Sequence, residues 1–210
     1  MTRATACLRR GLTAMALLAV APTTAPAAPR NADPNWPCQQ AKVSELSVAS
    51  YWSGPAVDPS ATGWQQDTAV ASLVGVITQR RLPLDQAEVR IASFARTAGA
   101  EKNRALLEVF AGVFEVLNRE RANVMAGLDR YAERQKALAE NLRRDGEALR
   151  AAQAASPPDE AKVAELTQRL AWDSEVFESR RQSLHVACDV PAIIEQRLYG
   201  LATALQRQLD

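Results

Sequence analysis

The chain has 210 residues, of which 25 are basic and 24 are acidic, and its formal net charge is +1. This balance excludes the strongly basic composition that is typical of nucleic-acid-binding domains, so no nucleic-acid partner is expected. Hydrophobic residues make up 47% of the chain, which is compatible with one globular domain that buries a sizeable core.

Residues 1–27 show the three-part pattern of a cleaved secretory signal. The basic residues Arg3, Arg9 and Arg10 precede an apolar run at 11–21, and small residues follow it. This run is too short to cross a bilayer, which requires about 20 residues, and no later segment is longer. The sequence therefore predicts a signal peptide and a periplasmic protein without a transmembrane span. An uncleaved anchor is the alternative, and the pattern leaves the choice between Sec and Tat export open.

Cysteine usage points to one disulfide. Cleavage after residue 27 would remove Cys7 and three of the 25 basic residues, which leaves 22 basic against 24 acidic residues and two cysteines, Cys38 and Cys188. An even pair in an oxidising compartment predicts a bridge between them. A closed loop of this length stabilises the fold by about 5 kcal/mol on the chain-entropy model. We expect the bridge to tether the N-terminal segment to the C-terminal part of the fold.

The segment at residues 28–61 has neither a helical nor a strand period. It contains Trp36, Tyr51 and Trp52, and Trp64 follows shortly after it. Such aromatic residues either fill grooves on the helical part of the protein or form a recognition loop. The nearby cysteine favours packing. Under the second alternative Trp36 and Trp52 are candidates for binding a partner.

This segment carries two short motifs, W-P-C-x-Q at residues 36–40 and Y-W-S-G-P at residues 51–55. Together, after a signal sequence, they resemble the opening of a group of secreted helical proteins of Gram-negative bacteria. The resemblance covers residues 33–55 and implies a secreted helical protein. It implies no activity, so no functional residue is carried over from it.

Helical periodicity begins near Thr62. A first apolar face predicts a helix that ends before Pro83, although its β-branched content leaves a buried strand as an alternative. Asp85 is a candidate N-cap of a second, short helix, and Gly99 is its expected stop. The first face consists of Val70, Leu73, Val74 and Ile77.

A long antiparallel hairpin is predicted at about 101–187. Apolar residues separated by threes and fours, without a proline, predict a helix from about 101 to 152 with one stutter near Arg121. The turn at 153–159 contains two prolines, and Asp159 can cap the helix that follows. That helix has a heptad seam with polar breaks at Asp173 and Arg180. Folding about the turn places Leu138 near Asp173 and Val124 near Ala187 and Cys188.

Asp189-Val190-Pro191 is expected to cap and begin a separate last helix, with an apolar stripe from Ile194 to Leu209. The predicted fold is therefore all-α. A helical domain at 62–210 forms a bundle base, made of residues 62–125 and 186–210, from which the two-helix coiled-coil hairpin projects.

No motif in the sequence carries an obvious chemistry. His185, Cys188 and Asp189 lie within one helical turn, but a bridged sulfur cannot act as a thiolate nucleophile. Glycine-rich phosphate loops and the residue spacings of haem, zinc and di-iron sites are absent. We therefore expect a protein that is not an enzyme and binds no cofactor or metal.

Trp172 is the strongest candidate for contact with a partner. It falls at heptad position c, which is normally open to solvent, and Val176 lies one turn further on. Coverage of Trp172 within the fold is the alternative.

We expect a structural or adaptor protein that binds an envelope partner, or a second copy of itself, through the hairpin. A holdase-like chaperone is one alternative, although residues 166–170 lack the final glutamine of the L-T-x-x-Q chaperone signature. An enzyme or cofactor carrier with an unrecognised site is the other.

Overall fold

The computed structural model describes residue 33 and residues 35–209, so the predicted signal peptide at residues 1–27 lies outside the described part. In that part the regular secondary structure is entirely helical and no strand occurs, which confirms the all-α class. The elements are η1 (Val48–Ser50), η2 (Trp64–Gln66), α1 (Thr68–Ile77), α2 (Leu84–Thr97), η3 (Gly99–Glu101), α3 (Lys102–Ala154) and α4 (Glu160–Gln206).

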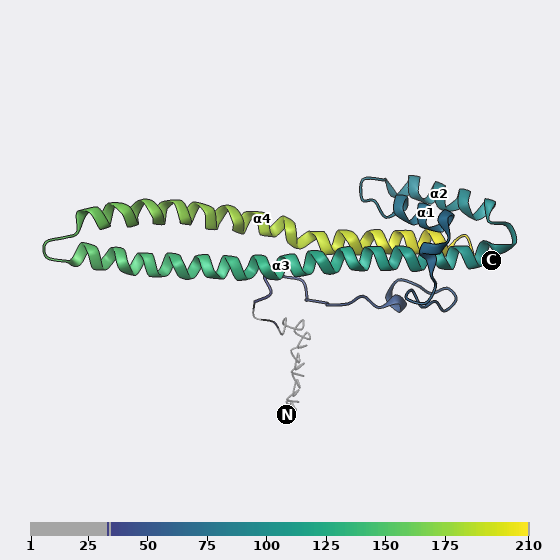
Figure 1. The fold of residues 1–210 in the computed structure, drawn as a ribbon, viewed down its shortest axis with the longest axis horizontal. Helices are drawn as coiled ribbons and strands as arrows, with labels where there is room; N and C mark the ends of the chain where they lie inside the picture. Colours follow the sequence, from purple (N-terminus) through teal and green to yellow (C-terminus); the bar gives the residue numbers. More distant parts are fainter. Residues whose placement is uncertain (1–32, 34, 210) are drawn as a thin grey trace, which may run out of the picture. The chain divides into compact units, whose positions relative to one another are not determined.

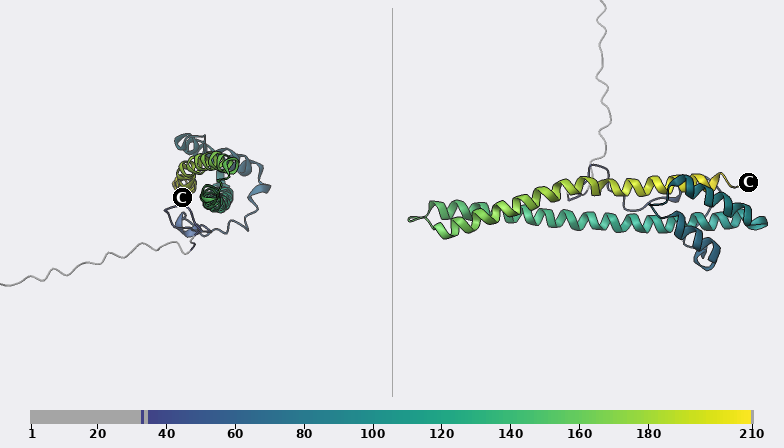
Figure 2. Two further views of the ribbon diagram at one scale, coloured as in Figure 1. Left: turned by 90° about the vertical axis from the view of Figure 1, so that its left-hand side faces the viewer. Right: turned by 90° about the horizontal axis from the view of Figure 1, so that it is seen from above.

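Helices α3 and α4, of 53 and 47 residues, run antiparallel and side by side as a hairpin (Figures 1 and 2). The Asp159 side chain caps α4 by accepting a hydrogen bond from the backbone N–H of Lys162. The predicted register is confirmed. The Gln135 side chain donates to the Phe177 carbonyl at 2.8 Å, which fixes the middle of the hairpin.

The expectation of a separate last helix is wrong, because α4 continues without interruption through Pro191 (Figure 1). A proline inside a helix removes one backbone hydrogen bond and its ring crowds the preceding turn, at a cost of about 3 kcal/mol. Here Pro191 is itself buried, and the buried residues Cys188 and Ile194 hold the helix against the fold on both sides of it. Tertiary packing therefore overrides the local signal, and Asp189 lies inside the helix rather than at its start.

Helices α1 and α2 cover the base of the hairpin. Helix α1 forms as predicted, and its N-cap Asp67 accepts from the N–H groups of Ala69 and Val70. The predicted cap at Asp85 is wrong: the N-cap of α2 is Pro83, two residues earlier, and Asp85 lies in the first turn of the helix. Gly99 has φ of 56°, a left-handed conformation that glycine adopts without strain, and it ends α2 as expected.

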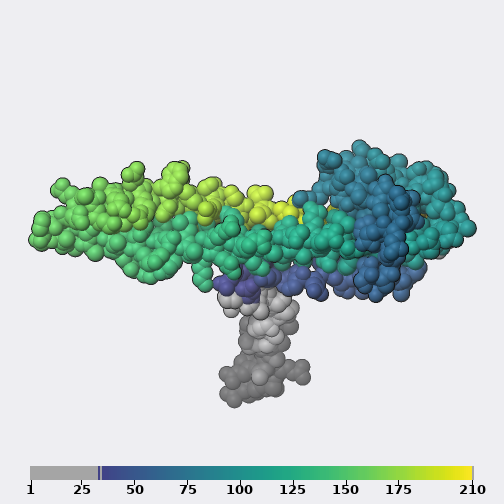
Figure 3. Space-filling view, viewed as in Figure 1, coloured from purple at the N-terminus to yellow at the C-terminus, as the bar shows by residue number. Residues whose placement is uncertain are grey.

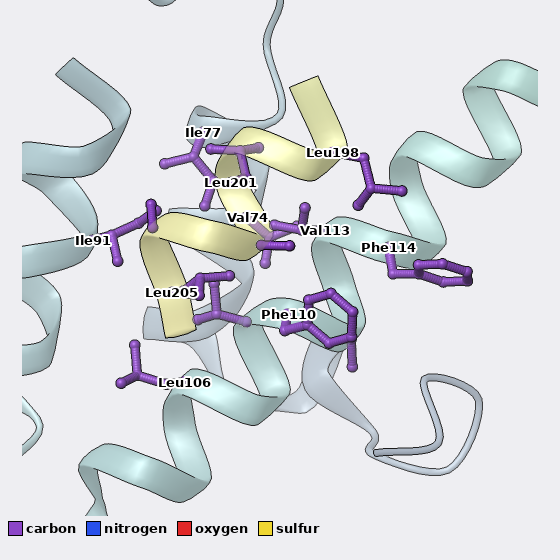
Figure 4. Packing of buried hydrophobic residues seen from close by; sticks show 14 of the residues in the cluster. Val74, Ile77, Ile91, Leu106, Phe110, Val113, Phe114, Leu198, Leu201 and Leu205 are labelled. Carbon is purple, nitrogen blue, oxygen red and sulfur yellow. The ribbon is translucent and has the colours of Figure 1, made fainter. Parts of the chain in front are cut away.

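The core of the protein lies in this base, between α1, α2 and the adjoining ends of α3 and α4 (Figure 4). Gly112 on α3 permits the closest approach, since a Cβ atom there would lie 2.8 Å from the Trp64 ring and 2.8 Å from the Val74 side chain. Other members of the cluster include Ile77, Ile91, Leu106, Phe110, Val113, Leu198, Leu201 and Leu205.

The distal half of the hairpin is built differently. Beyond Leu128 on α3 and before Cys188 on α4, Leu166 is the one buried residue of the two helices. Figure 3 shows this half of the hairpin, in green, uncovered by α1, α2 and the N-terminal segment on the face in view. We call residues 129–187 the arm. Its seam consists mainly of half-buried side chains.

Candidate partner-binding site

The N-terminal segment is fixed to the hairpin where the arm meets the base. Cys38 and Cys188 form the predicted disulfide, with their Cα atoms 5.6 Å apart. The Trp36 indole N–H donates to the Gln40 carbonyl at 2.8 Å, and the Gln40 side chain donates to the carbonyl of Cys188. The bridge, Trp36, Met125 and Leu128 form a second small core cluster, separate from that of the base.

An ion-pair clasp reinforces this attachment. The Lys42 ammonium lies 2.8 Å from a carboxylate oxygen of Asp33 and 2.8 Å from one of Asp129 on α3. The hydrogen bond from Lys42, together with the Asn35 backbone N–H, lowers the pKa of Asp33. Hydrogen bonds to Asp129 and Asp33 raise the pKa of Lys42. The ionised forms of Asp33 and Lys42 therefore hold the segment against α3.

The aromatic residues of the segment are directed inward. Trp52 is buried and stacks on Phe110 with ring centroids 4.0 Å apart, and its indole N–H donates to the Pro55 carbonyl. Trp64 is buried as well, and its N–H donates to Glu115 at 2.8 Å. Trp36 and Trp52 thus occupy positions that match the packing alternative. Both residues are buried.

Trp172 has the opposite environment. It is 66% exposed on α4, as its heptad position predicts, whereas Val176 is half-buried beside it. Two residues that the sequence analysis did not single out, Val186 and Ile193, are also exposed on α4. Their signal was present in the sequence, because 172, 186 and 193 differ by multiples of seven and so share one helical face.

Two surface grooves flank the N-terminal segment. One, of about 600 Å³, lies against α4 and is lined by His185 and the disulfide. The other, of about 920 Å³, lies between Trp36, α3 and Phe177 of α4. Trp172 lines neither groove. The structure therefore does not gather Trp36, Trp52 and Trp172 into one site, and the exposed candidates are those on α4.

The described residues show no arrangement for metal chemistry, since no group of three or more His, Cys, Asp or Glu side chains is placed to hold an ion. Within the same residues, none of the helices has the length and apolar character needed to span a bilayer. Cys188 is bonded to Cys38, so its sulfur is not a thiol in this structure.

Comparison with known proteins identifies no relative of this chain. No protein-family model matches the chain, and no curated protein or solved structure is significantly similar to it.

Proposed function

We propose that this protein is a non-catalytic adaptor or structural protein of the cell envelope, and that it binds a partner protein, or a second copy of itself, through the arm. One observation carries the proposal. The arm projects beyond the core with a single buried residue, yet it displays a tryptophan that is 66% exposed.

The energetics of the arm support a role other than stability. Ordering each residue costs about 1–2 kcal/mol of backbone conformational entropy. Complete burial of a leucine such as Leu166 offsets only about 1.5–3 kcal/mol of the entropy cost summed over the arm. An exposed tryptophan offers a large contact area with few rotatable bonds, which is why this residue is common at the centres of interfaces.

Site-specific photo-crosslinking tests the proposal. A photoreactive amino acid is placed at position 172 and, as the control, at position 199, where Tyr199 is comparably exposed on the same helix in the base. After irradiation of the cells that make the protein, we expect one dominant adduct at position 172 and none at 199. Many adducts at position 172 would indicate a chaperone that holds diverse clients. The absence of any adduct would contradict the proposal.

A further inference from the structure

Helix α4 carries a second heptad seam, of which only Val176 and Val190 are partly covered by the described chain. Its positions follow one another at spacings of four and three, and all seven are uncharged: Trp172, Val176, Ser179, Ser183, Val186, Val190 and Ile193. We call this set the stripe. Spacing of this kind keeps residues on one face of a helix that packs against another helix. At 1.5 Å per residue the stripe is about 32 Å long.

The exposure of the stripe is uneven. Trp172, Val186 and Ile193 are 66%, 71% and 48% exposed, and the two serines are exposed between Trp172 and Val186. Val176 and Val190 are half-buried, and Val190 packs against the core of the base. The Ser183 hydroxyl donates to the Ser179 carbonyl at 3.0 Å, so the helix itself satisfies it. A partner packing over this point would meet small side chains that permit close approach.

Both ends of the stripe are marked by a change in side-chain character. Towards the tip the same helical face carries Glu165 and Arg169, which pair with each other. Towards the base it carries Arg197, whose guanidinium donates to the carbonyls of Ile77 and Leu82 between α1 and α2. The uncharged face is therefore confined to residues 172–193.

The stripe continues an interface that already exists. One turn beyond Ile193, the corner between α1 and α2 covers this face, and at Gly200 a Cβ atom would lie 2.7 Å from the side chain of Leu84 at the start of α2. In the base, then, this face of α4 packs against other parts of the chain, including a helix. Past the corner Val190 still packs against the core of the base, whereas Trp172, Val186 and Ile193 are exposed.

The flanks of the stripe indicate the charge of what covers it. On one side the stripe is flanked by Glu175, Gln182 and Asp189, and on the other side by Asp173 and Arg180. None of the three carboxylates has an ion-pair or hydrogen-bond partner in the part of the chain that the structure describes. Flanking charges of this kind set the choice and orientation of a helical partner more than its affinity.

We infer that the stripe is the docking surface for an amphipathic helix of another protein, with an apolar seam and lysine or arginine residues beside that seam. This inference rests on the proposed adaptor function and specifies its interface. The partner helix lies along 172–193 and ends at the corner between α1 and α2.

A second copy of the chain fits the stripe less well. In the antiparallel register that pairs the stripe with itself, Glu175 meets Asp189 of the second copy, and Arg180 meets the Arg180 of that copy. Like charges at such flanking positions oppose association. The second α4 would also continue past the stripe into the corner that covers Arg197 and Gly200.

Mapped photo-crosslinking in the full-length protein tests this inference. The photoreactive amino acid is placed in turn at 172, 186 and 193, and at position 153 near the tip of the arm as a control for contacts elsewhere. Peptide mass spectrometry then locates the attachment points. We expect the three stripe positions to label one protein at sites spaced by multiples of seven along a single helix with basic flanks.

A charge-reversal pair provides the second readout. Glu175→Lys with Asp189→Lys should reduce the yield of these adducts at least tenfold, while the helical circular dichroism signal and the thermal midpoint stay unchanged. The matched control, Glu45→Lys with Glu133→Lys, alters the net charge equally at exposed residues away from the stripe. It should leave the yield as it was.

The outcomes separate the inference from the proposed function. Labelling at 172, with or without labelling at the tip, but not at 186 and 193, overturns the stripe and leaves the adaptor function standing. A self-adduct, a partner surface that is not helical, or a yield that charge reversal does not lower also overturns the inference. No adduct at any position overturns both.

Discussion

Gly112→Ala tests the packing that holds the base together, and its effect can be worked out from the structure. Two contributions to the free energy of unfolding oppose each other. Alanine is favoured over glycine inside a helix by about 0.8–1.0 kcal/mol. The new Cβ atom, however, would lie 2.8 Å from both the Trp64 ring and the Val74 side chain, and such overpacking costs about 1–3 kcal/mol.

Gly127→Ala on the same helix is the matched control. A Cβ atom there meets only the Arg130 guanidinium, at 3.9 Å, so the variant keeps the helical gain without the clash. We expect it to raise the free energy of unfolding by about 1 kcal/mol. Because both variants share this gain, the difference between them isolates overpacking and should be about 1–3 kcal/mol.

Urea unfolding followed by circular dichroism measures both free energies. Gly200→Ala should fall between the two variants, because the Leu84 side chain that it meets is partly exposed and can turn away. If Gly112→Ala proved as stabilising as Gly127→Ala, then α1 and Trp64 would not lie against α3 as described, and the placement of the base would be refuted.

Three further predictions concern the N-terminal segment. Reduction of the Cys38–Cys188 bridge should lower the free energy of unfolding by up to about 5 kcal/mol, measured as the shift in urea midpoint with and without dithiothreitol; an unchanged midpoint would contradict it. Trp52→Ala should cost about 3–5 kcal/mol in the same assay, since it removes a buried ring, and a loss below 1 kcal/mol would show that the ring is not packed. The hydrogen bond from Lys42 lowers the pKa of Asp33 in the folded protein. Ionised Asp33 therefore stabilises the clasp fully above the ordinary carboxyl pKa of 3.8, and this stabilisation is lost as the pH falls through the lower folded pKa. Asp33→Asn should therefore weaken protection of the segment from hydrogen exchange at neutral pH, and the difference from the wild type should shrink as the pH falls through the lowered folded value. Equal protection at neutral pH would count against the clasp.

The hairpin could be predicted from the sequence because several signals agreed. The heptad spacing, the absence of proline across α3 and the proline turn before Asp159 all indicate two antiparallel arms, and together they set the register. The bridge between Cys38 and Cys188 then followed from a count of cysteines. Each of these inferences depends on local or counting rules that tertiary contacts do not reverse.

Other features depend on contacts that a single sequence does not display. Pro191 is a helix-breaking signal, yet burial of its neighbours keeps α4 continuous. The aperiodic segment gave no period from which to decide which faces of Trp36 and Trp52 are buried. The heptad spacing of the stripe is present in the sequence, but its two serines, Ser179 and Ser183, do not distinguish it from an ordinary solvated face. The exposure of Val186 and Ile193 in the structure revealed it.

Native mass spectrometry of the complex that co-purifies with the tagged protein tests whether the arm binds a partner. We expect one complex of fixed composition from wild-type cells. It should be absent for Trp172→Ala and retained for Tyr199→Ala, since both residues are exposed on α4 but only Trp172 lies on the arm. Both exposed substitutions should change stability by less than about 0.5 kcal/mol, so loss of folding would not explain the difference. A complex that survives Trp172→Ala unchanged, or a wild-type protein recovered without any bound chain, would contradict the claim that the arm is a binding device.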